Sequence, residues 1–296
     1  MEKWSGKTDG LPWMQRSLVA MFRFLPVQLL YAVMALVVPF YVVFNRPAYR
    51  AIYQFGRQRL GYGPLRAFGH VCKNNFRFGQ IILDRFRAYA GMRFGFEFEN
   101  KQLFDALESS DKGFVQLSAH VGNYEMAGYA LNSKLKRFNA LVYAGETETV
   151  MQNREKLLSA HNMSMIPVKS DMSHLFRANA ALENGEIVSM PADRVFGSSK
   201  SFTCDFYGGK AQFPMGPFLM AVQKEVDALA VFVMKESTYN YRIIVRKLNG
   251  NQEGNLRQKA AALAQSYAQE LESIVRRYPE QWFNYFDYWI GDEEKY

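Results

Sequence analysis

A histidine and a carboxylate lie five residues apart in the run His120–Glu125, which reads HVGNYE. The run follows a predicted strand over residues 113–118 and begins a predicted helix over residues 124–135. Open α/β sheets bind ligands at the carboxyl ends of their strands, and the helix dipole favours a carboxylate in a first helical turn. We therefore predict that His120 removes a proton from a substrate alcohol, while Glu125 fixes the histidine tautomer and stabilises the imidazolium.

The alternative is that His120 and Glu125 form a cap or a surface pair, which is the commoner role of a lone histidine near a glutamate. Of the four histidines in the chain, only His120 falls where a predicted strand gives way to a predicted helix. This position favours the catalytic interpretation. It requires no serine or cysteine nucleophile, because the attacking hydroxyl can belong to the substrate.

A second group of polar residues, Asp193 and Arg194, follows the predicted strand over residues 186–190. We expect it at the same edge of the sheet as His120. There the Arg194 guanidinium could bind a phosphate or carboxylate, and Asp193 could orient it. Arg154, in a predicted helix over residues 147–160, is a further candidate anion ligand. For each of these residues the alternative is a structural role, and neither glycine-rich phosphate-binding motif is present.

Strand-like and helix-like segments alternate from residue 97 onward. Strands are predicted over residues 113–118, 138–143, 163–168, 186–190, 202–207, 227–235 and 240–247. Helices are predicted over residues 101–109, 124–135, 147–160, 171–183, 214–224 and 255–277. This alternation predicts an α/β fold with a mixed sheet flanked by helices, and with antiparallel pairing near residues 202–247.

An apolar segment of twenty residues without formal charge, residues 25–44, precedes that region. It is long enough to cross a hydrocarbon core of about 30 Å. Pro26 and Pro39 leave open a helix that dips into one leaflet, and a buried core helix is the alternative to membrane attachment. We predict an N-terminal membrane anchor in residues 1–60, a basic amphipathic helical region in 61–95 and an α/β domain in 96–296. Residues 1–16 read as a short polar leader.

Positive charge is concentrated around the apolar segment. The net charge is +8, and residues 1–100 hold 14 Lys and Arg against 5 Asp and Glu, whereas the remainder holds 22 against 23. Because these cations surround an apolar anchor, we expect anionic lipid as the partner and no nucleic acid. Two cysteines, Cys72 and Cys204, are too few for a disulfide framework and form no Cys/His cluster, so no metal is expected.

Taken together, these motifs resemble those of the lipid A biosynthesis acyltransferases, a branch of the lysophospholipid acyltransferase superfamily. The resemblance covers roughly residues 15–290. It is carried by the apolar anchor, the run His120–Glu125, Arg154, the run Pro191–Arg194 (PADR), the run Phe206–Gly209 (FYGG) and the run Tyr278–Trp282 (YPEQW).

The resemblance implies a lysophospholipid acyltransferase-like fold, with His120 as the general base and Glu125 as its partner. It also implies that Gly122, Asn123, Arg154, Asp193 and Arg194 bind substrate. The acyl donor would be an acyl carrier protein or coenzyme A thioester, with no cofactor, and the acceptor a hydroxyl on a phosphorylated, acylated glucosamine disaccharide. We expect a monomer on the cytoplasmic face of the bacterial inner membrane.

The chain departs from the family after Trp282, where residues 283–289 read FNYFDYW in place of a basic ending. An acceptor with few phosphates, or another bacterial lipid such as an aminolipid or a pigment lipid, is therefore a credible alternative. A hydrolase acting on water and a non-catalytic membrane lipid-binding protein are the two further alternatives.

Overall fold

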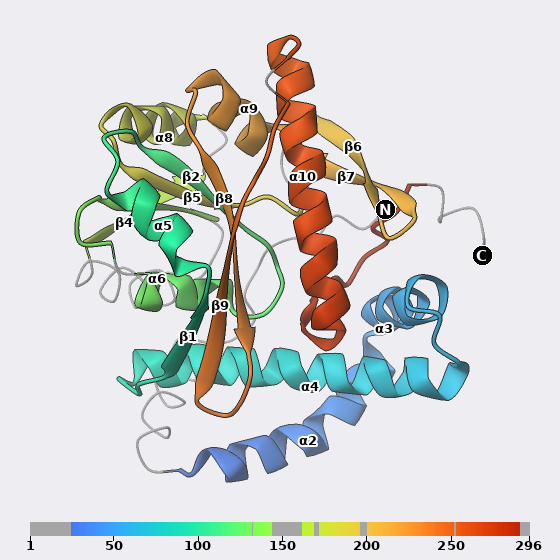
Figure 1. Ribbon diagram of the computed structural model, residues 1–296. Coiled ribbons are helices and arrows are strands. Elements are labelled where there is room, and N and C mark those ends of the chain that lie inside the picture. The colour runs from blue at the N-terminus through green and yellow to red at the C-terminus, as the bar shows by residue number, and fades with distance from the viewer. Residues whose placement is uncertain are drawn as a thin grey trace.

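Seven strands form one sheet in the order β1-β9-β8-β2-β5-β3-β4 in the computed structural model of this chain (Figure 1). The structure describes residues 25–131, 133–143, 162–168, 172–195, 200–251 and 253–290. The predicted leader (1–16), the predicted helix over 147–160 and its candidate ligand Arg154 lie outside these residues.

The strands of this sheet are β1 (Gly95–Glu99), β2 (Phe114–Ser118), β3 (Phe138–Tyr143), β4 (Met163–Val168), β5 (Ile187–Pro191), β8 (Ala228–Lys235) and β9 (Asn240–Lys247). All neighbouring pairs are parallel except β8 and β9. A separate antiparallel hairpin joins β6 (Ser201–Phe206) to β7 (Gly209–Pro214). The predicted mixed sheet, with antiparallel pairing within residues 202–247, is therefore confirmed.

Both faces of the sheet are buried, so the central strands read as continuous apolar runs. Val115 and Leu117 of β2 pack into one cluster with α8 (Ser173–Glu183), α9 (Met215–Gln223) and α10 (Leu256–Arg277). Phe114 packs into a second cluster, with α4 (Pro64–Tyr89) and α5 (Lys101–Glu108). Helices thus cover the sheet on both sides.

Most predicted helices are found within one or two residues of their expected bounds, because their sequence carries clear boundary signals. The long helix α10 begins at a capping box, in which the Asn255 side chain accepts from the Gln258 N–H and the Gln258 side chain accepts from the Asn255 N–H. The strands β1 and β7 were not predicted. The latter joins β6 through Tyr207 and Gly208, which both have positive φ.

The helix predicted over residues 124–135 is much shorter than expected. It consists of a 3-10 turn (η2, Tyr124–Met126) and one α-helical turn (α6, Ala127–Ala130). The Glu108 carboxylate accepts hydrogen bonds from the backbone N–H groups of Lys134 and Leu135, at 2.7 and 3.2 Å. These bonds replace those of a continued helix and hold the segment as a loop.

The N-terminal part is a layer of helices beside the sheet: α2 (Val27–Phe44), α3 (Arg46–Gln54), the π-helical turn η1 (Phe55–Arg59) and α4. Among the described residues, α2 is the single helix long and apolar enough to cross a membrane. Its Tyr31 ring packs edge-on against Phe76 of α4, and its Val42 lies in a cluster with Val71.

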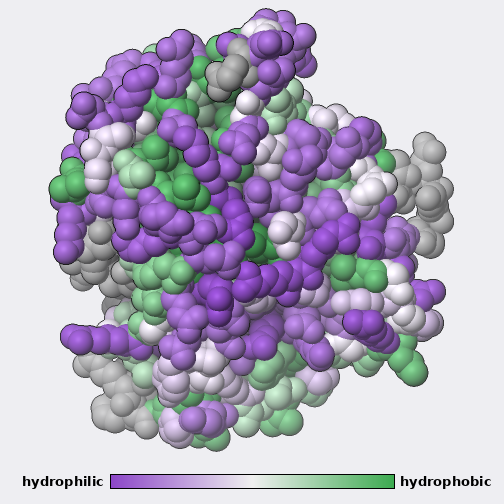
Figure 2. Space-filling model, in the orientation of Figure 1, coloured by the Kyte–Doolittle hydropathy of each residue, from purple (hydrophilic) through white to green (hydrophobic). Residues whose placement is uncertain are grey.

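The helix α2 therefore lies along α4 (Figure 1) and is not a free stalk. Its opposite face exposes large apolar side chains, which are Leu29, Val33, Leu36, Val37, Phe40, Val43 and Phe44. Apolar residues accordingly reach the surface along the lower edge of Figure 2, below a face that is largely hydrophilic.

Candidate active site

The pairing register of two parallel strands brings His120 and Asp193 together. Ser118, the last residue of β2, is the register partner of Pro191, the last residue of β5. His120 and Asp193 each follow two residues later, so both side chains lie at the carboxyl edge of adjacent strands. This is the edge at which open α/β sheets bind ligands, and the prediction that these residues share it is confirmed.

Asp193 holds His120 by two contacts, one to the ring and one to the backbone. Its Oδ1 lies 2.9 Å from the ring Nδ1, and its Oδ2 accepts a hydrogen bond from the His120 backbone N–H at 2.9 Å. The carboxylate is 1% exposed, while the imidazole is 19% exposed. A carboxylate on Nδ1 favours the tautomer with its proton there, which leaves Nε2 as the nitrogen that can accept a proton.

The charges around this pair favour a neutral imidazole beside an ionised carboxylate. Burial and the nearby Arg194 guanidinium lower the pKa of His120, although Asp193 acts in the opposite direction. Burial alone would raise the pKa of Asp193, but the hydrogen bonds from His120 and the charge of Arg194 lower it. A histidine that remains neutral at neutral pH is suited to act as a base.

Glu125 does not make the ring contact that the sequence analysis assigned to it. Among the described residues, its carboxylate pairs with Arg85 of α4 at 3.1 Å and accepts from the Tyr89 hydroxyl at 3.4 Å. The guanidinium of Arg85 also lies over the Tyr124 ring, 5.4 Å from its centroid. The physical reason is the turn at η2, which directs Glu125 toward α4 while the strand register supplies Asp193 to the histidine.

Arg194 is part of the site and is held by the C-terminal segment. Its guanidinium donates to the Phe283 carbonyl at 2.5 Å, lies 4.0 Å from the Asp193 carboxylate and stacks over Phe286, 5.4 Å from the ring centroid. The Tyr288 hydroxyl donates to the Asp193 carbonyl at 2.7 Å. The aromatic ending that departs from the family pattern is therefore a wall of this site.

The turn after His120 is held by its backbone. The N–H of Gly122 donates to the Gln281 carbonyl at 2.8 Å, and the N–H of Asn123 donates to the Val233 carbonyl at 2.7 Å. Gly122 has a φ of +58°, and a Cβ there would lie 2.1 Å from the Val233 oxygen. Asn123 is fully buried. The structure therefore gives these two residues scaffold contacts, and the substrate binding implied by the resemblance stays a prediction.

Sequence reasoning missed two contributors to this site. The first is Arg85, which lies in the predicted basic amphipathic region (61–95), although that pattern could not indicate a particular partner. The second is the segment Phe283–Trp289, which was noted as a departure in composition. The antiparallel bridge between Val121 and Trp282 brings that segment onto the turn that follows His120.

The fold and the site together define an α/β protein with a His/Asp pair at the carboxyl edge of a mixed sheet and an apolar N-terminal helix. The family model described as bacterial lipid A biosynthesis acyltransferase matches residues 76–289. The chain belongs to this family of bacterial lipid A biosynthesis acyltransferases, as the resemblance in the sequence indicated.

Comparison with individual proteins adds little to the family match. No curated protein matches the chain. A crystal structure of the 1-acyl-sn-glycerophosphate (LPA) acyltransferase PlsC from Thermotoga maritima is similar over 89% of this chain and 98% of its own, with 14% identity and a TM-score of 0.37. A superposition this loose says nothing of the chemistry of the present chain.

Proposed function

We propose that this protein transfers a fatty acyl group from a thioester to a hydroxyl of a lipid acceptor at a bacterial membrane. The observation that carries the proposal is the contact between His120 Nδ1 and Asp193 Oδ1 at the carboxyl edge of the sheet, within the segment that matches the acyltransferase family. A thioester is already activated, so the chain needs to supply a base, stabilisation of the oxyanion and positioning.

In the proposed reaction, Nε2 of His120 accepts the proton of the acceptor hydroxyl as its oxygen attacks the thioester carbonyl carbon. A carbon–oxygen bond forms, and the carbonyl electron pair moves onto oxygen. When the tetrahedral intermediate collapses, the carbon–sulfur bond breaks and the imidazolium returns the proton to the departing thiolate. Asp193 stabilises the imidazolium during this sequence, and it replaces Glu125 in the role first assigned to that residue.

Arg194 is the proposed source of positive charge for the oxyanion or for an acidic group of the substrate. It lies near enough to lower the pKa of His120, and its guanidinium is pre-positioned by the Phe283 carbonyl and the Phe286 ring. The backbone N–H groups of Gly122 and Asn123 are used inside the scaffold, so they do not supply an oxyanion hole.

Arg85 is a further cation beside the catalytic turn, and we assign it to anion binding with Arg194 and, outside the described residues, Arg154. The charge count of the catalytic part, 22 cations against 23 anions after residue 100, favours an acceptor with few phosphates. The donor is an acyl carrier protein or coenzyme A thioester, as in the family.

The exposed apolar face of α2 is the proposed membrane attachment. One face of this helix is covered by α4, and the other exposes Leu36, Phe40 and Phe44. The segment between residues 25 and 83 contains seven cations and no acidic residue. An anionic leaflet would attract such a layer. We place the chain on the cytoplasmic face of the inner membrane, with α2 lying in one leaflet alongside α4.

The test is acyl transfer by the purified full-length chain in detergent micelles, with an acyl carrier protein thioester and a lipid extract of the host as acceptor. Mass spectrometry should find a product lipid heavier by one acyl group, with its formation abolished in the His120→Asn variant. Release of free fatty acid without any acceptor would favour a hydrolase. Tight lipid binding with neither product would favour a non-catalytic lipid-binding protein.

A further inference from the structure

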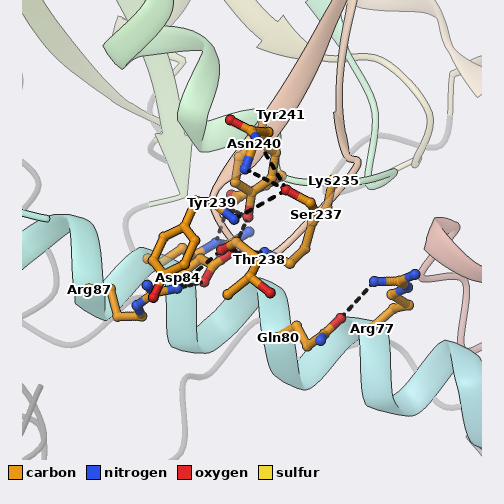
Figure 3. Close-up of polar contacts among 12 residues, drawn as sticks. Arg77, Gln80, Asp84, Arg87, Lys235, Ser237, Thr238, Tyr239, Asn240 and Tyr241 are labelled. Atoms are coloured by element: carbon orange, nitrogen blue, oxygen red, sulfur yellow. Dashed lines mark hydrogen bonds and ion pairs between the residues drawn. The ribbon is translucent and has the colours of Figure 1, made fainter. Parts of the chain in front are cut away.

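Asp84, Arg87 and Lys235 form a buried group of charged residues that the proposed reaction does not use (Figure 3). Asp84 and Arg87 project from α4 and meet Lys235 and Tyr241, which flank the turn between β8 and β9. The side chains of Asp84, Arg87 and Lys235 are at most 1% exposed. Burial of three charges is costly unless the charges are paired in good geometry and their remaining polar atoms are hydrogen-bonded.

The Asp84 carboxylate accepts three hydrogen bonds. Its Oδ1 accepts from Arg87 at 2.8 Å, and its Oδ2 accepts from the Lys235 ammonium and from the Tyr241 hydroxyl. Burial and the Asp84 charge raise the pKa of Tyr241 well above its usual value of 10, so the phenol keeps its proton and donates a hydrogen bond to Asp84.

Because the Tyr241 hydroxyl donates to Asp84, its oxygen is available as an acceptor. The Asn123 side-chain amide donates to that oxygen at 3.3 Å, and the amide carbonyl accepts from the Arg85 guanidinium at 3.5 Å. The direction of each bond thus sets the orientation of the Asn123 amide. Asn123 is three residues after His120, in the turn that carries the base.

A second connection runs through the backbone of Lys235. Its N–H and carbonyl are both bonded to the Gln281 side chain at 2.9 Å, and the Gln281 carbonyl accepts from the Gly122 N–H. Lys235, one of the two cations that pair with Asp84, is therefore also tied to the turn after His120 through Gln281.

We propose that Asp84 is a positioning residue for the transferase reaction, which acts through Tyr241 and Asn123 to hold the His120 turn in its reactive geometry. This inference rests on the proposed function only for its kinetic readout. Its structural prediction is that loss of the Tyr241 hydroxyl loosens the turn after His120 and weakens the contact between His120 and Asp193.

The chief test variant is Tyr241→Phe, which removes one hydroxyl and retains the buried ring. Its matched control is Tyr278→Phe, which removes a comparable tyrosine-to-carboxylate bond of 2.6 Å to Glu236, beyond the end of β8, without a link to Asn123. Asp84→Asn is a second variant, but it leaves two buried cations without a carboxylate and risks misfolding. Tyr241→Phe keeps the test independent of that risk.

Two readouts are required, both on the full-length chain in micelles. The first is the Nδ1–H resonance of His120 in a sample labelled with ¹⁵N-histidine, assigned by its absence in His120→Asn. We expect this resonance to be broadened by exchange with water in Tyr241→Phe and to be retained in Tyr278→Phe. The second is the kinetics of acyl transfer, where kcat should fall about tenfold in Tyr241→Phe with KM for the acyl donor nearly unchanged.

An unchanged Nδ1–H resonance in Tyr241→Phe would overturn the proposal, and so would a fall in kcat no larger than that of Tyr278→Phe. If the native chain transfers no acyl group, the proposed function fails. The NMR comparison still decides whether Asp84 and Tyr241 position the turn.

Discussion

His120 and Asp193 are partners although 73 positions separate them in the sequence, and their side chains meet at 2.9 Å. The distance follows from the alignment of β2 and β5, whose final residues Ser118 and Pro191 are register partners. A shift of one residue in this pairing would move the two side chains apart and turn one of them to the other face of the sheet. The candidate active site therefore depends on the sheet register as much as on the residues themselves.

The roles of the two acidic residues near His120 can be separated by substitution. We expect Asp193→Asn to lower kcat by at least about a hundredfold, because an amide neither enforces the Nδ1–H tautomer nor stabilises the imidazolium. Glu125→Gln should weaken the hold on Arg85 and leave the Nδ1–H resonance of His120 in place. Steady-state kinetics and ¹⁵N-histidine spectra check both variants, and loss of the resonance in Glu125→Gln alone would reverse the assignment.

The pH dependence of kcat/KM reports the base. The pKa of His120 is lowered from 6.5 by burial and by Arg194, so the acid limb of the native profile should lie below pH 6.5. Arg194→Gln removes a positive charge that disfavours the imidazolium, and the acid limb should move to higher pH. Arg276→Gln, a change at an exposed cation, is the control and should leave the limb in place. A shift of the Arg194→Gln limb to lower pH would contradict the electrostatic account.

Two glycines with positive φ provide a matched test of the turn that follows His120. Gly122→Ala places a Cβ 2.1 Å from the Val233 carbonyl oxygen, whereas Gly208→Ala, at a φ of +69°, meets no atom within 4 Å. Both changes should cost about 1 kcal/mol of unfolding free energy from the backbone strain alone. Gly122→Ala should cost distinctly more and should also lower kcat. Thermal unfolding and acyl-transfer kinetics of the two variants check this prediction. Equal losses of stability and of kcat in both variants would argue against a tight turn at Gly122.

His70 should make the fold sensitive to acid. It is buried in α4 beside the rings of Phe55 and Tyr62, and burial lowers its pKa from 6.5 to about 4. The unfolded chain binds a proton between these values and the folded chain does not. Stability should therefore fall as the pH falls from 6.5 to 4, by about 3 kcal/mol in total. The unfolding midpoint, measured against pH, should depend less on pH between 4 and 6.5 in His70→Phe than in the native chain. Identical profiles for the two proteins would contradict the lowered pKa of His70.

Membrane attachment should depend on the outer face of α2. Replacing Leu36, Phe40 and Phe44 by glutamine removes exposed apolar surface and leaves the packing against α4 intact. We expect a high-salt wash to release this variant from membranes, because only the attraction between the basic residues and anionic lipid then holds it there. Val42→Ala, at a residue buried against α4, should lower stability without release. Full retention of the triple variant after a salt wash would place the anchor elsewhere.

The resemblance to the family, the alternation of strands and helices and the apolar helix could all be inferred from the sequence, because each is written in local patterns. The match to the family, the mixed sheet and α2 confirm them. The placement of Asp193 and Arg194 at the edge that carries His120 was also predictable, since both groups directly follow apolar strands. The predicted boundary near residue 95 and the assignment of residues 96–296 as one acyltransferase domain stay predictions.

What the sequence could not determine is which carboxylate meets the histidine. Glu125 is nearer along the chain, and local spacing therefore favoured it. The distant Asp193 contacts His120 because hydrogen bonding between the parallel strands β2 and β5 aligns their ends. The short turn at η2 directs Glu125 toward Arg85 instead. The same limit applies to Asp84 and to the aromatic segment after Trp282. Their partners come from packing of α4 and of the C-terminal segment against the sheet, and no local pattern encodes contacts over such separations.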